Sequence, residues 1–168
     1  MHVVIVILVL LASFKWGNWN NWREYHASML FITAGGLLYE YIVKEFTLWN
    51  FHTDFLFSHE MTVILYALIA MPVSILIFLS HFPERKFQQL IYIFLWSGVY
   101  ILIEYILNCF GRIEYKHGWS IWHSFLFDLV MFSVIALHHH SPFRAYLLSI
   151  FITIFLIDYF NVPFVVTK

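Results

Sequence analysis

The chain has 168 residues, of which 62% are hydrophobic and only 11% are charged, and its formal net charge is −1. Soluble domains carry roughly 25% charged residues, so a soluble protein of this composition would expose large apolar patches and aggregate. The near-neutral charge also argues against nucleic acid as a partner. The composition therefore predicts an integral membrane protein whose first partner is the lipid bilayer.

Six apolar segments approach the length of about 20 residues that a helix needs to cross the hydrocarbon core. The connections between them are short, which favours antiparallel hairpins. We therefore predict an all-α fold, one polytopic transmembrane helical bundle over residues 1–168 with about six spans in three hairpins. Whether the short first segment crosses fully is left open. The spans are expected near residues 2–15, 27–44, 61–81, 88–109, 119–138 and 143–162.

Three tryptophans follow the first segment at a spacing of three residues. Trp16, Trp19 and Trp22 are separated by glycine and asparagines. This pattern is typical of a segment that lies in the headgroup layer, where an indole ring places its apolar body in lipid and its N–H near water. A platform on which a ligand stacks is the alternative.

Glycine and proline interrupt the second and third segments. Gly35 and Gly36 are small enough to let a neighbouring helix approach closely in lipid, and Pro72 should kink the third segment. A shared pattern, His-x-Pro-x-Arg, follows the third and fifth segments at residues 81–85 and 140–144. We interpret this pattern either as helix punctuation or as the trace of a duplicated hairpin.

The distribution of lysine and arginine over the short loops predicts the orientation. One side carries five basic residues and the other side four, so both termini are expected outside. The five are Lys15, Arg23, Arg85, Lys86 and Arg144, and the four are Lys44, Arg112, Lys116 and Lys168.

Ionisable side chains within the apolar segments form the candidate site. At a rise of about 1.5 Å per residue, Glu40, Glu104, His123 and Asp158 each lie roughly 6–8 Å from the same face of the bundle, and Asp128 lies about 14 Å in. Charged groups facing lipid are unfavourable, so these side chains should face the bundle interior or an aqueous cavity.

Three interpretations of this polar cluster stay open. The carboxylates and the imidazole suit a divalent metal such as zinc or manganese. Buried carboxyl groups can also carry protons. A structural network of hydrogen bonds that holds the helices together is the third interpretation.

The second and fourth loops lie on the same side as the polar cluster and could form a lid over it. Their histidines and acids are also possible metal ligands, although no zinc-binding spacing supports such a site. These residues are His52, Asp54, His59, Glu60 and His117.

The set Lys15-Trp16-Gly17-Asn18-Trp19, Leu48-Trp49-x-Phe51, His81-Phe82-Pro83 and His117-Gly118-Trp119 resembles an uncharacterised family of small polytopic membrane proteins of endospore-forming bacteria. The resemblance covers most of the chain and implies a bacterial cytoplasmic membrane. It implies no activity and no catalytic residue.

Three functions are compatible with these observations. The first is a small transporter or channel-type protein that uses the polar cluster. The second is a structural or accessory subunit whose cluster only holds the bundle together, with a second copy or another membrane protein as partner. The third is a membrane-embedded enzyme acting on lipid headgroups. No nucleophile elbow, phosphate loop or Rossmann fingerprint is present, so an enzyme is the least supported class.

Overall fold

The computed structural model describes residues 1–44, 46–52 and 58–163, and most of these are helical. Between the helices lie a 3₁₀ turn, η1 (Trp19–Asn21), a π-helical turn, η2 (Tyr66–Ala70), and the strands β1 (Trp49–Phe51) and β2 (Ile113–Tyr115). The helices are α1 (His2–Trp16), α2 (Trp22–Val43), α3 (His59–Leu65), α4 (Met71–Ser80), α5 (Lys86–Cys109), α6 (Ile121–His140) and α7 (Pro142–Tyr159).

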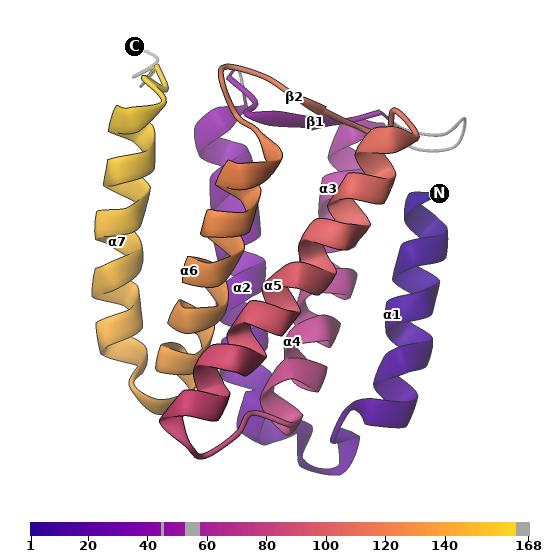
Figure 1. Cartoon of the computed structure of the whole chain (residues 1–168), viewed down its shortest axis with the longest axis vertical. Helices are drawn as coiled ribbons and strands as arrows, with labels where there is room; N and C mark the ends of the chain where they lie inside the picture. The colour runs from indigo at the N-terminus through magenta and orange to yellow at the C-terminus, as the bar shows by residue number, and fades with distance from the viewer. Residues whose placement is uncertain (45, 53–57, 164–168) are drawn as a thin grey trace.

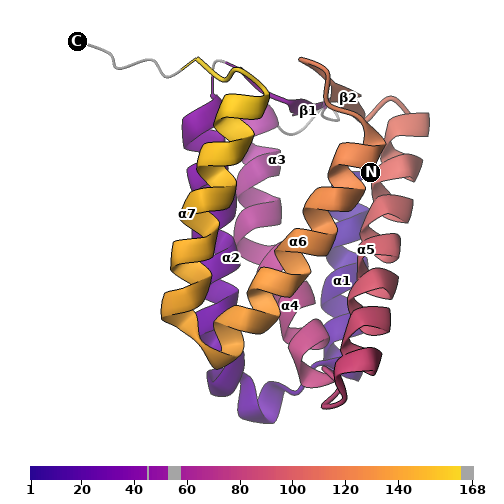
Figure 2. The same ribbon diagram turned by 60° about the vertical axis from the view of Figure 1, so that its left-hand side comes forward.

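The chain runs up and down one bundle (Figures 1 and 2). It descends through α1, rises through α2, descends through α3, η2 and α4, rises through α5, descends through α6 and rises through α7. We call the end of the bundle that carries β1 and β2 the strand end. The C-terminal ends of α2, α5 and α7 and the N-terminal end of α6 all lie there, as the predicted hairpin order requires.

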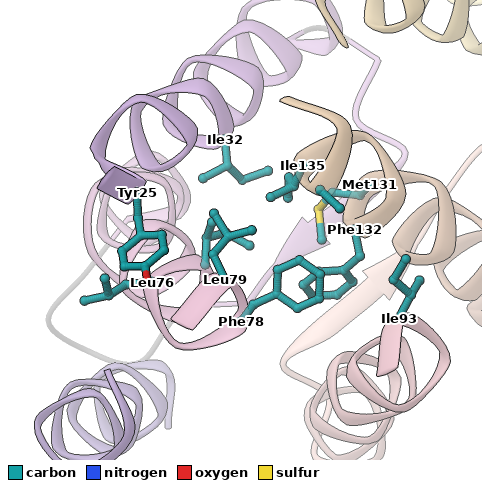
Figure 3. Packing of buried hydrophobic residues seen from close by; sticks show 11 residues of the cluster. Tyr25, Ile32, Leu76, Phe78, Leu79, Ile93, Met131, Phe132 and Ile135 are labelled. Atoms are coloured by element: carbon teal, nitrogen blue, oxygen red, sulfur yellow. The ribbon is translucent and has the colours of Figure 1, made fainter. Parts of the chain in front are cut away.

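Helix α4 occupies the centre of the packing. Ile75, Leu76 and Phe78 are fully buried, and α4 packs against α1 and α2. Figure 3 shows Phe78 of α4 facing Phe132 of α6, with ring centroids 4.8 Å apart. Contact with α5 is made through side chains, as where the Tyr92 hydroxyl donates to the Phe78 carbonyl at 3.1 Å. The core therefore joins α2, α4, α5 and α6.

The third predicted span contains the π-helical turn directly before Pro72. The Met71 N–H donates to the Tyr66 carbonyl, five residues back, so Ala67 does not receive the bond that an α-helix would give it. The Thr33 hydroxyl of α2 donates to the Ala67 carbonyl instead, at 2.8 Å. The irregularity expected at Pro72 is thus a π turn whose free carbonyl is satisfied by α2.

The two glycines of α2 differ in their surroundings. A Cβ added to Gly36 would lie 3.5 Å from the Ala67 Cβ, which is ordinary contact, and one added to Gly35 would meet nothing within 4 Å. Gly36 therefore faces η2 closely, as the predicted packing role suggests, but this contact leaves room for alanine.

Four helices are long and apolar enough to cross a membrane among the residues that the structure describes. They are His59–Ser80, Lys86–Cys109, Ile121–His140 and Pro142–Tyr159, and they correspond to the last four predicted spans. His2–Trp16 and Trp19–Val43 qualify only when joined, and they are bent by 89° at their break. The mainly helical architecture is confirmed, whereas the pairing of β1 with β2 was not predicted.

Gly17 determines the break after α1. A Cβ at this position would lie 2.6 Å from the Ser13 carbonyl oxygen, so a larger residue would force the backbone to shift. The same carbonyl accepts a hydrogen bond from the Trp19 indole at 3.0 Å. The Asn18 N–H donates to the Ser80 hydroxyl at 3.0 Å, which ties the bend to the end of α4.

The outward faces of the peripheral helices are apolar. Only 6% of the most apolar stretch of α7 and 17% of that of α5 are buried within the protein. The exposed side chains include Phe87, Leu90, Phe94, Leu95 and Leu102 on α5, and Phe143, Phe151, Ile154 and Phe155 on α7.

Candidate functional site

The two strands cover the strand end of the bundle. β1 pairs antiparallel with β2 in the register Trp49↔Tyr115, Asn50↔Glu114 and Phe51↔Ile113. Side chains alternate between the two faces of a strand, and Trp49, Phe51 and Ile113 all line a cavity within the bundle. The two strands therefore form part of the cavity wall at this end, and the side chains that they direct into the cavity are apolar.

The cavity has a volume of about 150 Å³ and is bounded by α1, η2, α4, α5, α6 and the strand pair. Aromatic side chains make up much of its wall: Trp49, Phe51, Tyr66, Tyr100, Trp119 and Phe127. Its remaining polar groups are Ser74, Glu104, Ser124 and Asp128. No lysine, arginine or histidine belongs to this described lining.

Glu104 is held by a hydrogen-bond network that joins α5, β2 and α6. The Ser124 hydroxyl donates to Glu104 Oε1 at 2.5 Å, and the Tyr115 hydroxyl donates to the same oxygen at 2.9 Å. The buried Trp119 indole N–H donates in turn to Ser124 Oγ at 2.8 Å. Glu104 is therefore fixed in place by side chains from three segments.

Tyr115 lies on β2 and is the donor that connects the lid to this network. Partial burial, together with the nearby Glu104 carboxylate, raises the pKa of the Tyr115 hydroxyl well above its usual value. The Tyr115 hydroxyl therefore stays protonated at neutral pH and can donate its hydrogen bond to Glu104.

Asp128 differs from Glu104 in having no such support. Its side chain is only 6% exposed, and its Oδ2 atom has no hydrogen-bond partner among the described residues. The carboxyl group is close enough to Glu104 and Tyr100 to interact with both electrostatically. A buried polar atom without a partner costs free energy. Tyr39, His59 and Ser97 also have such an atom, but of the four residues only Asp128 lines the cavity, so it is the strongest candidate for a functional group.

A second pair of hydroxyl groups, from Ser74 and Tyr100, braces another part of the cavity wall. Ser74 donates its proton to the Met71 carbonyl at 2.7 Å. The Tyr100 hydroxyl lies 2.5 Å from Ser74 Oγ, and it is the donor in this pair because the serine proton is already used. This bond fixes the Tyr100 ring across the gap between α4 and α5.

The remaining residues of the predicted polar cluster lie outside the cavity. Glu40 pairs with His59, with 3.4 Å between Oε1 and Nε2. His123 Nδ1 lies 2.8 Å from the Ser120 hydroxyl at the start of α6. Asp158 is exposed on α7. All share the strand end, but only Glu104 and Asp128 line the same space.

The predicted lid residues are peripheral to the cavity. His52 Nε2 lies 3.1 Å from Glu114 across the strand pair, on the exposed side. His59 also accepts a hydrogen bond from the Phe51 N–H at 3.2 Å. Glu60 is exposed in the first turn of α3, and His117 stacks on Phe46 with centroids 3.6 Å apart. Asp54 lies outside the described residues.

The described residues were also compared with the divalent metal site that the sequence suggests. Among residues 1–44, 46–52 and 58–163, no three histidine, cysteine, aspartate or glutamate side chains are placed to hold an ion together. Two carboxylates in a mainly aromatic cavity are a different arrangement from a metal site, which needs several converging ligands.

Several residues of the site were not predicted. Ser124 and Trp119 complete the Glu104 network, while Tyr100 and Ser74 form part of the wall. A signal was available for some of them. Tyr100 and Glu104 are four residues apart on α5, and Ser124 and Asp128 are four apart on α6, so each pair shares one helix face.

Comparison with protein-family models, curated proteins and solved structures found no match for this chain. The resemblance to small membrane proteins of endospore-forming bacteria stays a prediction, and the site is interpreted from its own geometry.

Proposed function

We propose that the chain is an integral membrane protein of the small transporter or channel type, which binds a cation or a proton at Asp128 within the cavity. In this proposal α1, α2, α3–α4, α5, α6 and α7 form six membrane crossings in three hairpins. Following the resemblance, the membrane is the bacterial cytoplasmic membrane, with both termini and the strand end outside.

The exposed apolar faces of α5 and α7 support a membrane location. An apolar surface of this extent would cause aggregation in water, whereas lipid chains match it. Trp16, Trp19 and Trp22 support it further, because they are 51%, 37% and 38% exposed beside the break between α1 and α2. Exposed indoles at one end of a bundle suit the headgroup layer.

The main support for the proposed activity is the environment of the Asp128 carboxyl group. Its carboxyl group is buried, lines a cavity and lacks a partner for Oδ2 in the described structure. Ionisable groups inside membrane bundles commonly mark ion or proton pathways. Tyr100 and Glu104 provide polar neighbours between which a bound cation or a proton can be shared.

A structural role is the second candidate, and the Glu104 network favours it. Ser124, Tyr115 and Glu104 are joined by hydrogen bonds that hold α5, β2 and α6 together, as expected of a cluster that only stabilises the bundle. Asp128 distinguishes the two functions, since a structural carboxylate would be satisfied by partners within the protein.

Proton flux in proteoliposomes tests the proposed function. Purified protein is reconstituted with a trapped pH dye, and a potassium diffusion potential drives proton entry. We expect flux above that of empty liposomes, loss of this flux in Asp128→Asn, and retention in Asp158→Asn, which removes an exposed carboxylate near the same end. Wild-type flux equal to that of empty liposomes, or full flux in Asp128→Asn, would contradict the proposal.

A further inference from the structure

The chemistry of the cavity restricts what can bind beside Asp128. Two carboxyl groups, Glu104 and Asp128, line a space that has no basic side chain among its described lining residues. An anion would find no positively charged partner there. A neutral apolar molecule would leave the Asp128 Oδ2 atom without a hydrogen bond. The lining therefore favours a ligand that carries positive charge.

The aromatic wall argues against a hydrated inorganic ion. Trp49, Trp119 and Phe127 contact one another along this wall. Phe51 stacks on Tyr66, and such rings cannot replace the water ligands of a metal. They attract organic cations, because the negative face of an aromatic ring interacts favourably with an ammonium group. A mainly apolar wall also matches an apolar ligand body.

The Asp128 Oδ2 atom and the cavity volume restrict the chemical class and the size of the ligand further. Asp128 Oδ2 needs a hydrogen-bond donor, which a protonated amine supplies and a quaternary ammonium ion does not. The cavity volume is about 150 Å³, and an apolar cavity of about that size holds a molecule as large as benzene. A single ring or a short alkyl chain bearing one amino group would fill it.

We propose that the cavity is a binding site for a small primary ammonium ion with an apolar body, whose N–H groups donate to Asp128 and whose body packs against the aromatic wall. This inference rests on the proposed function, because it assigns the ligand of the same cavity. Glu104 contributes a second carboxyl group while staying hydrogen-bonded to Ser124 and Tyr115.

Binding of benzylamine to the purified protein in detergent tests this inference, with benzyl alcohol as a matched neutral ligand. Both are measured by isothermal titration calorimetry at pH 7, where the amine is charged. We expect benzylamine to bind at least about tenfold more tightly than benzyl alcohol, because a hydrogen bond to a charged group contributes that much or more.

Variants assign the effect to the proposed residue. Asp128→Asn should weaken benzylamine about 10- to 100-fold and leave benzyl alcohol unchanged, which also shows that the cavity is intact. Asp158→Asn should change neither affinity. Equal affinities of the two ligands for the wild type, an equal loss of both in Asp128→Asn, or no binding of either would overturn the inference.

The two proposals fail in different ways. Proton flux that depends on Asp128, without benzylamine binding, would leave the proposed function standing and remove the ammonium site. Benzylamine binding that depends on Asp128, without proton flux, would support the ammonium site and contradict proton transport.

Discussion

Replacing Asp128 with leucine should make the protein more stable. The carboxyl group is 6% exposed and its Oδ2 atom has no partner in the described structure. A buried polar atom without a hydrogen bond costs roughly 1–3 kcal/mol. The adjoining cavity of about 150 Å³ gives the larger leucine side chain space, so overpacking should not offset the gain.

The expected gain in the free energy of unfolding is therefore about 1–3 kcal/mol. For a chain of this length each kcal/mol shifts the midpoint of thermal unfolding by roughly 2–4 °C. Intrinsic tryptophan fluorescence, followed during heating in detergent, measures the shift. Asp158→Leu is the matched control, and its effect should stay within about 0.5 kcal/mol because the residue is exposed.

A loss of stability in Asp128→Leu would refute this reasoning. It would mean that the carboxyl group supports the fold, and the proposed function would then lose the observation that carries it. A gain in stability together with a loss of proton flux is the combination expected of a functional residue, since active sites often retain groups that are unfavourable for folding.

Three further predictions concern the surroundings of the site. Ser124→Ala should lower the free energy of unfolding by about 1–3 kcal/mol, because it leaves a buried indole N–H without an acceptor; Ser133→Ala, on the exposed face of the same helix, should change it by less than about 0.5 kcal/mol. Thr33→Val should lower it by about 1–3 kcal/mol, because the Ala67 carbonyl in the π turn loses its donor, and thermal unfolding measures both effects. Cys109 is exposed at the C-terminal end of α5. If the strand end is outside, a membrane-impermeant maleimide should label Cys109 on intact cells. Labelling only after lysis would mean that the strand end is inside.

The helices could be predicted well because hydropathy and length determine them. The segments predicted at 88–109 and 119–138 correspond to α5 and α6 within two residues at each end. Apolar runs of this length have few alternatives to a helix, since each backbone polar group must be satisfied within the segment.

The strand pair could not be predicted in the same way. Residues 49–51 and 113–115 are only three residues each, too short for an alternating pattern to be distinguished from a loop. Their pairing depends on the approach of two loops that are far apart in sequence, and this approach is set by the packing of the helices around them.

The candidate site was predicted in part. Depth along each helix predicts that Glu40, Glu104, His123 and Asp158 lie near one end of the bundle, where the ends of α2, α5, α6 and α7 meet. Depth alone does not determine the direction in which a side chain points around the helix axis. Asp158 therefore faces outward while Asp128, expected deeper, faces the cavity.

The π turn gave no sequence signal beyond Pro72. A proline predicts a disturbed helix, but whether the disturbance becomes a kink or a π turn depends on the donor that satisfies the freed carbonyl. Here Thr33 of α2 supplies it, and that partnership depends on tertiary packing.

The strand pair has a mechanical consequence for the bundle. β1 belongs to the half of the chain that ends with α4, and β2 belongs to the half that begins with α5. The strand pair therefore links the two halves at the end of the bundle opposite the covalent α4–α5 connection. Its bonds include His52 N–H to the Arg112 carbonyl at 3.0 Å and Lys116 N–H to the Leu48 carbonyl at 2.8 Å. Any rigid-body rotation that moves α3 away from α5 at this end must break these hydrogen bonds, and each contributes only about 0.5–1.5 kcal/mol. Opening the cavity toward the strand end therefore requires breaking this strand pair, whose hydrogen bonds contribute only part of the free energy that holds this end closed.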